Sequence, residues 1–325
     1  MDREITFAVA LREAISEEMR RDKNVFLLGE DIRYSVWGVT GGLNKEFGDD
    51  RVLHTPISEN GFISAAIGAA LIGTKPIVEL MYSDFLILAA DSVVNEAAKY
   101  RYMCGGGKFK VPLTIRAAGA GTGTGSGLHH SQSVEATFIH YPGLKIVIPS
   151  TPYDAKGLLK TAIRDNNPVI FFEHKLLYGQ RGMVPEEEYT IPFGKAAIRR
   201  KGKDITVVSW SYACHKVLEA AEKLSQENIE IEVIDPRTLF PFDKETLFQS
   251  IEKTNRLVIV EDGVKRGGVG SEIAGIVAEE RITELDAPIK RVGAKDVPIP
   301  GSRYGEKFVV PSVEDIIEAC KELVY

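Results

Sequence analysis

Long apolar stretches are missing from this sequence of 325 residues. No run approaches the roughly 20 consecutive apolar residues that a membrane-spanning helix needs, which argues against a membrane protein of that kind. The first residues, Met-Asp-Arg-Glu-Ile, also lack the basic segment and apolar core of a secretory signal. We therefore expect a cytoplasmic protein without a membrane partner.

Cysteine is equally scarce. The chain has three, Cys104, Cys214 and Cys320, which are odd in number and far apart. No Cys-x-x-Cys pair or Cys/His spacing is present, which excludes a disulfide framework and a structural zinc site. We expect all three to be reduced thiols.

Positive charge is not in excess, since 40 Lys and Arg residues stand against 46 Asp and Glu residues, a net charge of −6. A general nucleic-acid-binding protein carries the opposite sign, so no nucleic-acid partner is expected. Hydrophobic residues make up 44% of the chain and charged residues 26%, which is typical of a soluble globular protein.

Short apolar runs alternate with helical stretches along most of the chain. This alternation is typical of open, mostly parallel sheets in an α/β protein. The expected strands are residues 25–29, 76–80, 111–115, 144–148 and 169–172, then 205–210, 229–234, 257–260 and 289–292. Between the two series, residues 183–195 lose the pattern and gather prolines and acidic residues, as a linker does. We therefore predict two such domains, residues 1–187 and 188–325.

Open parallel sheets bind ligands at the carboxyl ends of their strands, so polar residues just after predicted strands are candidates for function. Glu59 follows one such strand and opens a helix rich in small residues. It is either a catalytic carboxylate or an ordinary first-turn carboxylate that interacts with the helix dipole. Residues 82–86, which include Phe85, open an apolar helical stretch that we expect to continue through residue 102. Taken alone, Phe85 would be read as a core residue.

Residues 119–127 form a glycine-rich loop that leads to His130. The loop has neither the Gly-Lys-Ser/Thr ending of a phosphate-binding loop nor the Gly-x-Gly-x-x-Gly spacing of a dinucleotide fold, which disfavours nucleotide binding. A loop that closes over a substrate fits better, and His130 would be its chemical group. A solvated loop histidine is the alternative. We expect Ser131 to cap the next helix.

The stretch from Ala162 to Pro168 ends a predicted helix in a turn that contains Asp165 and Asn167. Its carbonyls and carboxylate could hold a hard cation. An ordinary Asx-rich turn before a strand is the alternative.

Together, these segments closely resemble the beta subunits of the decarboxylating component of pyruvate, branched-chain and acetoin dehydrogenase complexes. The resemblance covers nearly the whole chain. Its motifs, in the expected order, are Leu28-Gly-Glu-Asp31, Thr55-Pro-Ile-Ser-Glu59, Asn95-Glu-Ala-Ala-Lys-Tyr-Arg-Tyr102, His130-Ser-Gln132, Pro142-Gly-Leu-Lys145, Asp154-Ala-Lys-Gly-Leu-Leu159, Ile234-Asp-Pro-Arg-Thr-Leu239 and Glu261-Asp-Gly-Val264. It implies a first domain that binds the pyrimidine of thiamine diphosphate and a second domain similar to the C-terminal domain of transketolase.

The resemblance also implies partners. Thiamine-diphosphate enzymes that hold the cofactor within one chain carry Gly-Asp-Gly followed by Asn, whose oxygens ligate Mg²⁺ on the diphosphate, and this chain has no Gly-Asp-Gly. A separate alpha subunit is therefore expected to hold Mg²⁺ and the diphosphate, in an alpha2-beta2 heterotetramer. A lipoyl acyltransferase component is the expected acceptor of the acyl group.

Individual residues take roles from the same resemblance. Glu59 would exchange a proton with the pyrimidine, and His130 would act as an acid-base group during acyl transfer to lipoyl. The residues expected to bind the cofactor are Glu30, Ile57, Glu59, Met81 and Phe85. Branched-chain members tend to have Gln and Tyr in place of Met81 and Phe85. The residues expected at a potassium site are Leu113, Ala162, Ile163, Asp165 and Asn167.

The function implied is oxidative decarboxylation of a 2-oxo acid, of the pyruvate or branched-chain type, with acyl transfer to lipoyl. The close alternative is an acetoin dehydrogenase beta subunit. From another class, a non-catalytic docking subunit is possible because half of the cofactor site is missing, although Glu59, Phe85 and His130 together argue against it. A nicotinamide dehydrogenase is disfavoured because the glycine fingerprint is absent.

Overall fold

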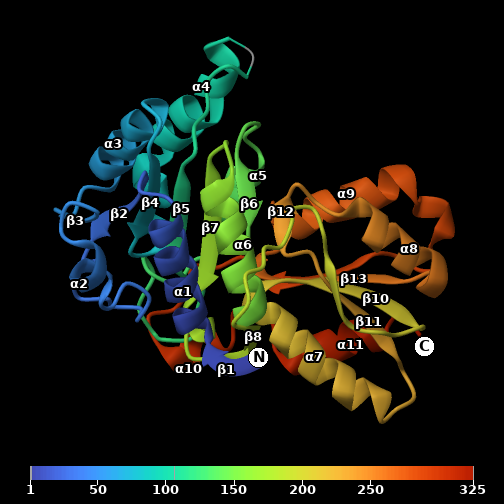
Figure 1. Cartoon of the computed structure of the whole chain (residues 1–325). Helices are drawn as coiled ribbons and strands as arrows, with labels where there is room; N and C mark the ends of the chain where they lie inside the picture. The colour runs from blue at the N-terminus through green and yellow to red at the C-terminus, as the bar shows by residue number, and fades with distance from the viewer. Residues whose placement is uncertain (1, 106, 325) are drawn as a thin grey trace.

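Two mostly parallel sheets form the framework of the protein in the computed structural model, which describes residues 2–105 and 107–324 (Figure 1). The first sheet has the strand order β12-β6-β7-β5-β4-β2-β3. Only β12 runs antiparallel to its neighbour. The strands are β2 (Val25–Glu30), β3 (Val52–Thr55), β4 (Lys75–Leu80), β5 (Thr114–Ala120), β6 (Lys145–Val147), β7 (Val169–His174) and β12 (Thr238–Phe240).

Helices cover both faces of this sheet. They are α1 (Phe7–Arg21), α2 (Leu43–Phe47), α3 (Glu59–Leu71), η1 (Ser83–Ala89), η2 (Ser92–Ala97), α4 (Ala98–Met103), α5 (Glu135–Ile139), α6 (Pro152–Arg164) and η3 (Lys175–Leu177). In α1, Leu11, Ile15 and Met19 recur every four residues and are fully buried, which is the periodicity that predicts a helix with one apolar face. Helix α6 packs against α1, and Lys160 pairs with Glu17 across the contact.

The second sheet has the order β14-β13-β10-β11-β9, and only β9 is antiparallel to its neighbour. Its strands are β9 (Ala197–Arg200), β10 (Ile205–Ser209), β11 (Ile231–Asp235), β13 (Leu257–Val264) and β14 (Lys290–Ala294). The helices are α7 (Ser211–Ser225), α8 (Lys244–Thr254), α9 (Val269–Glu280), η4 (Ile282–Glu284), α10 (Arg303–Glu306) and α11 (Val313–Lys321). The two sheets confirm the predicted α/β class.

The two sheets share one apolar core. Buried Phe138 and Ile146 from the first part of the chain belong to the same cluster as Trp210, Ile234 and Ile259 from the second. Strand β12 also crosses over, because it follows the second sheet's β11 in sequence but pairs with β6. Burial of a continuous apolar surface therefore holds the two sheets together.

Two local predictions differ from the structure. Residues 183–185, expected within a linker, belong to β8 (Arg181–Pro185), which pairs antiparallel with β1 (Asp2–Thr6). The helix expected from residue 82 to 102 is divided into the 3₁₀ segment η1, the π-helical segment η2 and α4. An apolar composition on all sides predicts burial, but it does not fix the number of residues per turn.

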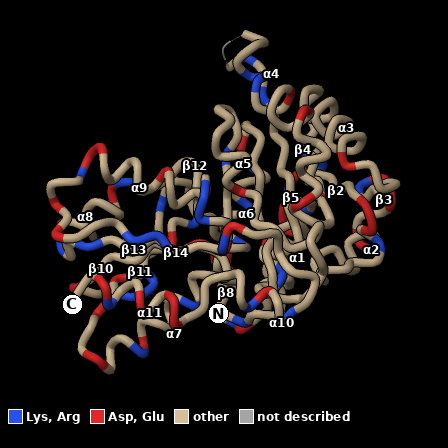
Figure 2. The backbone as a smooth tube through the Cα atoms, turned by 180° about the vertical axis from the view of Figure 1, so that it is seen from behind, with Lys and Arg blue, Asp and Glu red and all other residues tan. Residues whose placement is uncertain are grey.

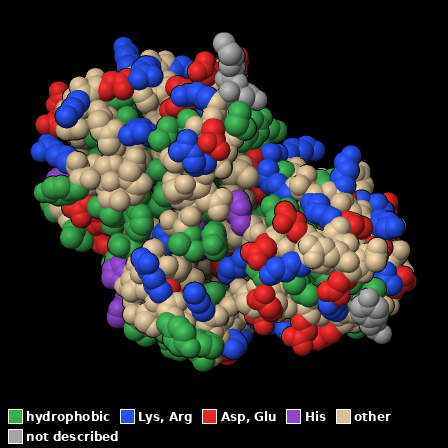
Figure 3. Space-filling view, turned by 90° about the horizontal axis from the view of Figure 1, so that it is seen from below, with side chains coloured by type: hydrophobic (Ala, Val, Ile, Leu, Met, Phe, Trp, Pro, Cys, Tyr) green, Lys and Arg blue, Asp and Glu red, His purple; other side chains and the backbone are tan. Residues whose placement is uncertain are grey.

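Charged residues of both signs occur along the outer helices and loops of both parts of the molecule (Figure 2). The face seen in Figure 3 likewise carries Lys and Arg side chains among Asp and Glu side chains. Within the described residues, every helix is too short or too polar to cross a membrane.

Candidate active site

Two buried carboxylates lie at the carboxyl edge of the first sheet. Glu30 is the last residue of β2, and Glu59 begins α3 after the neighbouring strand β3. Only 3% of Glu30 and 7% of Glu59 is exposed. Burial, reinforced by the charge of Glu59, raises the pKa of Glu30 to about 7. Glu30 can therefore hold a proton near neutral pH.

Glu30 connects this pair to the next strand. Its Oε1 accepts a hydrogen bond from the backbone N–H of Met81, which follows β4, at 3.2 Å. Its Oε2 is buried and has no hydrogen-bond partner among the residues that the structure describes. Buried polar atoms are normally satisfied, so this oxygen is available to a ligand that donates a hydrogen bond.

The remaining predicted cofactor residues differ in exposure. Met81 is buried and Phe85 is half-buried, whereas Ile57, two residues before Glu59, is 75% exposed. Glu30 is thus hydrogen-bonded to Met81 and close enough to Glu59 to be affected by its charge, while Ile57 lies at the surface of the loop that leads to Glu59.

His130 lies against aromatic rings of this region. Its imidazole meets the ring of Tyr82 edge-on at a centroid distance of 4.5 Å and that of Phe85 at 5.1 Å. Its neighbour His129 is exposed. The structure therefore brings His130 to the predicted cofactor residue Phe85 and leaves His129 in solvent.

Two residues that the sequence analysis did not single out fix the backbone around His130. Lys175 donates to the backbone carbonyl of His130, and Asp84 Oδ1 accepts from the backbone N–H and side-chain amide of Gln132 at 3.0 and 3.1 Å. Burial lowers the pKa of Lys175 to about 8. Lys175 directly follows β7, so its place at the carboxyl end of a strand was the signal that could have identified it.

The prediction that Ser131 caps the next helix is wrong. Helix α5 begins four residues later, with Val134 as its N-cap. Ser131 is buried, and its hydroxyl donates to Glu306 at 3.4 Å. The loop continues past Ser131 before the helix begins. The hydroxyl of Ser131 therefore bonds to a buried carboxylate from the other end of the chain and not to backbone N–H groups of the helix.

The residues of the predicted potassium site come from two neighbouring segments, Leu113 and the turn at 162–167. The backbone carbonyl of Leu113 accepts from the N–H of Val169, just after that turn. The side chains of Asp165 and Asn167 already accept from Lys145 and Arg101, respectively. Within residues 2–105 and 107–324, His, Cys, Asp and Glu side chains form no cluster of three or more that could hold a metal. A cation here would depend on backbone oxygens.

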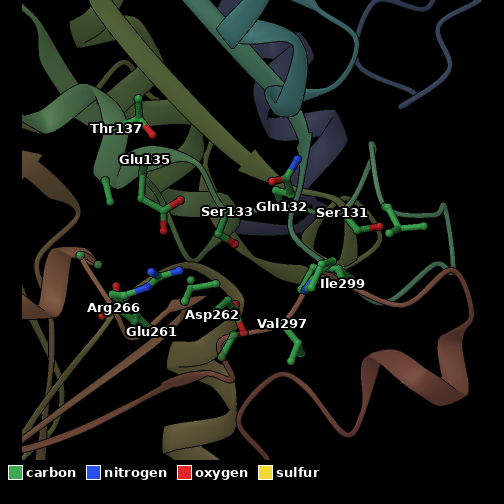
Figure 4. Close-up of a pocket in the computed structure, with 18 residues that line it drawn as sticks. Ser131, Gln132, Ser133, Glu135, Thr137, Glu261, Asp262, Arg266, Val297 and Ile299 are labelled. Carbon is green, nitrogen blue, oxygen red and sulfur yellow. The ribbon is translucent and has the colours of Figure 1, made fainter.

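A cavity of about 260 Å³ is lined by the segment that follows His130 and by the end of β13 (Figure 4). Gln132, Ser133 and Glu135 line it from one side, and Glu261 and Arg266 line it from the other. Burial raises the pKa of Glu261 to about 8, and the charge of Glu135 acts in the same direction. Polar and charged side chains from both parts of the chain therefore face this cavity.

The chain matches two family models. Residues 3–180 match the pyrimidine binding domain of transketolase, and residues 194–316 match the transketolase C-terminal domain. A solved structure described as "Split gene transketolase, inactive beta4 tetramer" is similar with a TM-score of 0.80 and 23% identity, over 98% of each chain, which shows a shared fold.

Curated relatives are similar over nearly their full length. The acetoin:2,6-dichlorophenolindophenol oxidoreductase subunit beta of Bacillus subtilis is 46% identical, covering 100% of this chain and 98% of the relative. The pyruvate dehydrogenase E1 component subunit beta of Rickettsia felis is 47% identical over 99% of each chain. The 2-oxoisovalerate dehydrogenase subunit beta of Bacillus subtilis is 43% identical over 98% of each. The chain therefore belongs to the family of transketolase-like dehydrogenase beta subunits that includes those of pyruvate, 2-oxoisovalerate and acetoin dehydrogenases.

Proposed function

We propose that this chain provides the pyrimidine-binding half of a thiamine-diphosphate active site that oxidatively decarboxylates a 2-oxo acid and transfers the acyl group to lipoyl. The observation that carries the proposal is the buried pair Glu30 and Glu59 at the carboxyl edge of the sheet, next to Met81. Phe85 and His130 lie in ring contact with each other. The family of the chain supports the same chemistry.

The residues fit an aminopyrimidine. The ring offers an N–H donor and a basic nitrogen, and the site offers an unpartnered buried oxygen on Glu30 and the carboxylate of Glu59. The aromatic face of Phe85 is half-buried and can stack on a flat ring. When bound, thiamine diphosphate would supply the carbanion chemistry that decarboxylation needs.

Glu59 holds and returns the proton of the pyrimidine nitrogen in this proposal. Its burial strengthens the hydrogen bond, because water does not compete for the carboxylate. Met81 and Ile57 border the ring and position it, while Glu30 accepts a hydrogen bond from it. Ile57 is exposed in this structure, and a bound pyrimidine would cover it.

His130 acts later, when the acyl group moves to lipoyl. Opening the dithiolane produces a thiolate that needs a proton, and imidazole is a suitable donor at neutral pH. Its packing against Tyr82 and Phe85 sets the direction in which the ring faces.

Partners complete the site. The chain has no Gly-Asp-Gly, so we assign Mg²⁺ and the diphosphate to an alpha subunit in an alpha2-beta2 heterotetramer, with a lipoyl acyltransferase as the next component. We place the boundary between the cofactor domain and the second domain at residues 187 and 188, and we expect the assembly in the cytoplasm. Potassium bound by the backbone oxygens of residues 162–167 and Leu113, beside Asp165 and Asn167, would stiffen this region.

Acetoin cleavage is the second candidate, because the Bacillus subtilis acetoin relative is as similar as the pyruvate relatives. A docking subunit without chemistry is disfavoured, since such a chain has no need of a buried Glu30 and Glu59 pair.

Co-expression with an alpha subunit tests the proposal. The purified assembly is expected to contain thiamine diphosphate and to turn over one substrate of a panel of 2-oxo acids and acetoin with an artificial electron acceptor. Each chain alone is the control and is expected to be inactive. Full turnover by the isolated chain, or an assembly that carries a nicotinamide instead, would contradict the proposal.

A further inference from the structure

Glu306 holds the glycine-rich loop from the far end of the chain. Its Oε2 accepts from the backbone N–H of Gly123 at 2.9 Å, and Oε1 and Oε2 accept from the N–H of Gly125 at 3.2 and 3.3 Å. Ser131, beyond His130, donates its hydroxyl to the same carboxylate at 3.4 Å. One side chain therefore binds the loop on both sides of His130.

The glycines are required by this geometry. Gly123 has a φ of +109° and Gly125 a φ of +69°, a region that other residues rarely adopt. A Cβ on Gly123 would also lie 2.4 Å from Leu176 Cδ1, and one on Gly125 would lie 3.0 Å from the backbone nitrogen of Arg303. Consecutive turns of this kind direct N–H groups into a concave anion-binding site. The anion here is a side chain of the same protein.

Outside the loop, Glu306 interacts with the charge of Lys175 but forms no close ion pair. It is 2% exposed, and among the described residues no lysine or arginine forms an ion pair with it. A buried carboxylate that forms no ion pair is costly unless N–H and O–H groups compensate, so the loop contacts, together with the nearby charge of Lys175, stabilise Glu306.

A neighbouring residue reinforces the contact. Arg303 Nε donates to the backbone carbonyl of Thr124 at 3.1 Å. Both Arg303 and Glu306 belong to α10, which follows β14 in sequence but lies beneath the first sheet's α1 in both Figures 1 and 2. The second half of the chain thus reaches across to the loop that carries His130.

We propose that Glu306 is a positioning residue for His130: it fixes the glycine-rich loop so that the imidazole stays at the cofactor side of the site during acyl transfer. This inference rests on the role proposed above for His130. It predicts different effects on the two half-reactions, because Glu30 and Glu59 lie on β2 and α3 and, among the described residues, no hydrogen bond joins either of them to Glu306.

The test compares Glu306→Gln and Glu306→Asp in the assembled complex with the matched control Glu314→Gln, an exposed carboxylate in the first turn of α11. Hydrogen exchange of residues 121–127 reports whether the loop is held. Decarboxylation with an artificial acceptor and reductive acylation of a lipoyl domain report the two half-reactions. His130→Ala is measured in parallel.

In Glu306→Gln, loop exchange is expected to accelerate roughly tenfold or more, since charged hydrogen bonds are lost. The kcat of lipoyl acylation should fall about tenfold with an unchanged KM for the lipoyl domain, while decarboxylation changes by less than about twofold. In Glu306→Asp, which keeps the charge, the rate of loop exchange and the kcat of lipoyl acylation should lie between those of Glu306→Gln and the wild type.

Unchanged loop exchange in Glu306→Gln would overturn the proposal, and so would equal losses in both half-reactions, which is the result of a purely structural role. Failure of the His130 assignment is visible separately, as an unaffected acylation rate in His130→Ala. In that case the positioning role of Glu306 for His130 fails as well. Where His130→Ala does lose acylation, a selective acylation loss in Glu306→Gln supports the positioning role, and its absence contradicts it.

Discussion

The imidazole of His130 meets the ring of Tyr82 edge-on at a centroid distance of 4.5 Å. The ammonium of Lys175 lies over the same Tyr82 ring, 5.5 Å from its centroid. Lys175 also binds the backbone carbonyl of His130. The three residues form one packed unit, so the histidine is held by its ring and by its backbone.

His130→Ala is expected to retain most decarboxylation with an artificial acceptor and to lose most reductive acylation of a lipoyl domain. The reason is that only acyl transfer needs a proton donor beside the opened dithiolane. The exposed His129 supplies the control, because His129→Ala should alter neither rate. Equal small losses in both variants would make His130 a bystander, and the reverse pattern would assign the role to His129.

Arg116→Met tests the polar interior of the first sheet. Arg116 on β5 pairs with Glu79 on β4 and with both carboxylate oxygens of Glu173 on β7 at 2.7 Å, and all three are fully buried or nearly so. Removing the cation leaves two uncompensated buried carboxylates, which should cost about 3–5 kcal/mol of stability.

Urea unfolding of the assembled complex, followed by tryptophan fluorescence, measures this loss. Arg266→Met is the matched control, since Arg266 pairs with Asp296 at the exposed surface. Its loss should change the unfolding midpoint little. Similar unfolding midpoints for Arg116→Met and the control would show that the buried network contributes no more than a surface pair.

Glu261 should make the stability of the protein decrease with rising pH. Burial raises its folded-state pKa to about 8, whereas an unfolded glutamate titrates near about 4.3. Between these values the folded state binds a proton that the unfolded state lacks, so stability is lost as pH rises towards about 8. Glu261→Gln removes this ionisation.

Melting temperatures of the assembled complex between pH 5.5 and 8.5 (about three pH units) provide the measurement. The melting temperature of Glu261→Gln is expected to increase relative to that of the wild type as pH rises. Glu272→Gln, an exposed carboxylate in the first turn of α9, is the control and should follow the wild type. A constant difference between Glu261→Gln and the wild type over this range would contradict the assignment.

The sequence predicts the sheets well because their signal is local. Nine short apolar runs were expected as strands, and each overlaps a strand of the structure, from β2 to β14. Strands buried on both faces need continuous apolar residues, so composition over five or six positions is sufficient.

What the sequence does not reveal depends on contacts between distant residues. Strand β12 is only three residues long, and its partner β6 lies about 90 residues earlier. The bonds from Glu306 to Gly123 and Ser131 span 183 and 175 residues. Nothing in the local pattern of residues 303–306 indicates such a partner. By contrast, Glu59 and His130 could be proposed from motifs, and the position of Lys175 just after a predicted strand could have identified it. The contact of Asp84 with Gln132 required the folded chain.

The most direct test of the account is the rate of decarboxylation by Glu59→Gln in the assembled complex, since Glu59 is the group proposed to activate the cofactor. Glu245→Gln, an exposed first-turn carboxylate of α8, is the control and should be fully active. We predict that Glu59→Gln assembles and binds thiamine diphosphate but decarboxylates at least roughly a hundredfold more slowly, because an amide cannot exchange the proton. A rate close to that of the wild type would show that Glu59 is only a helix-end carboxylate and would contradict the account.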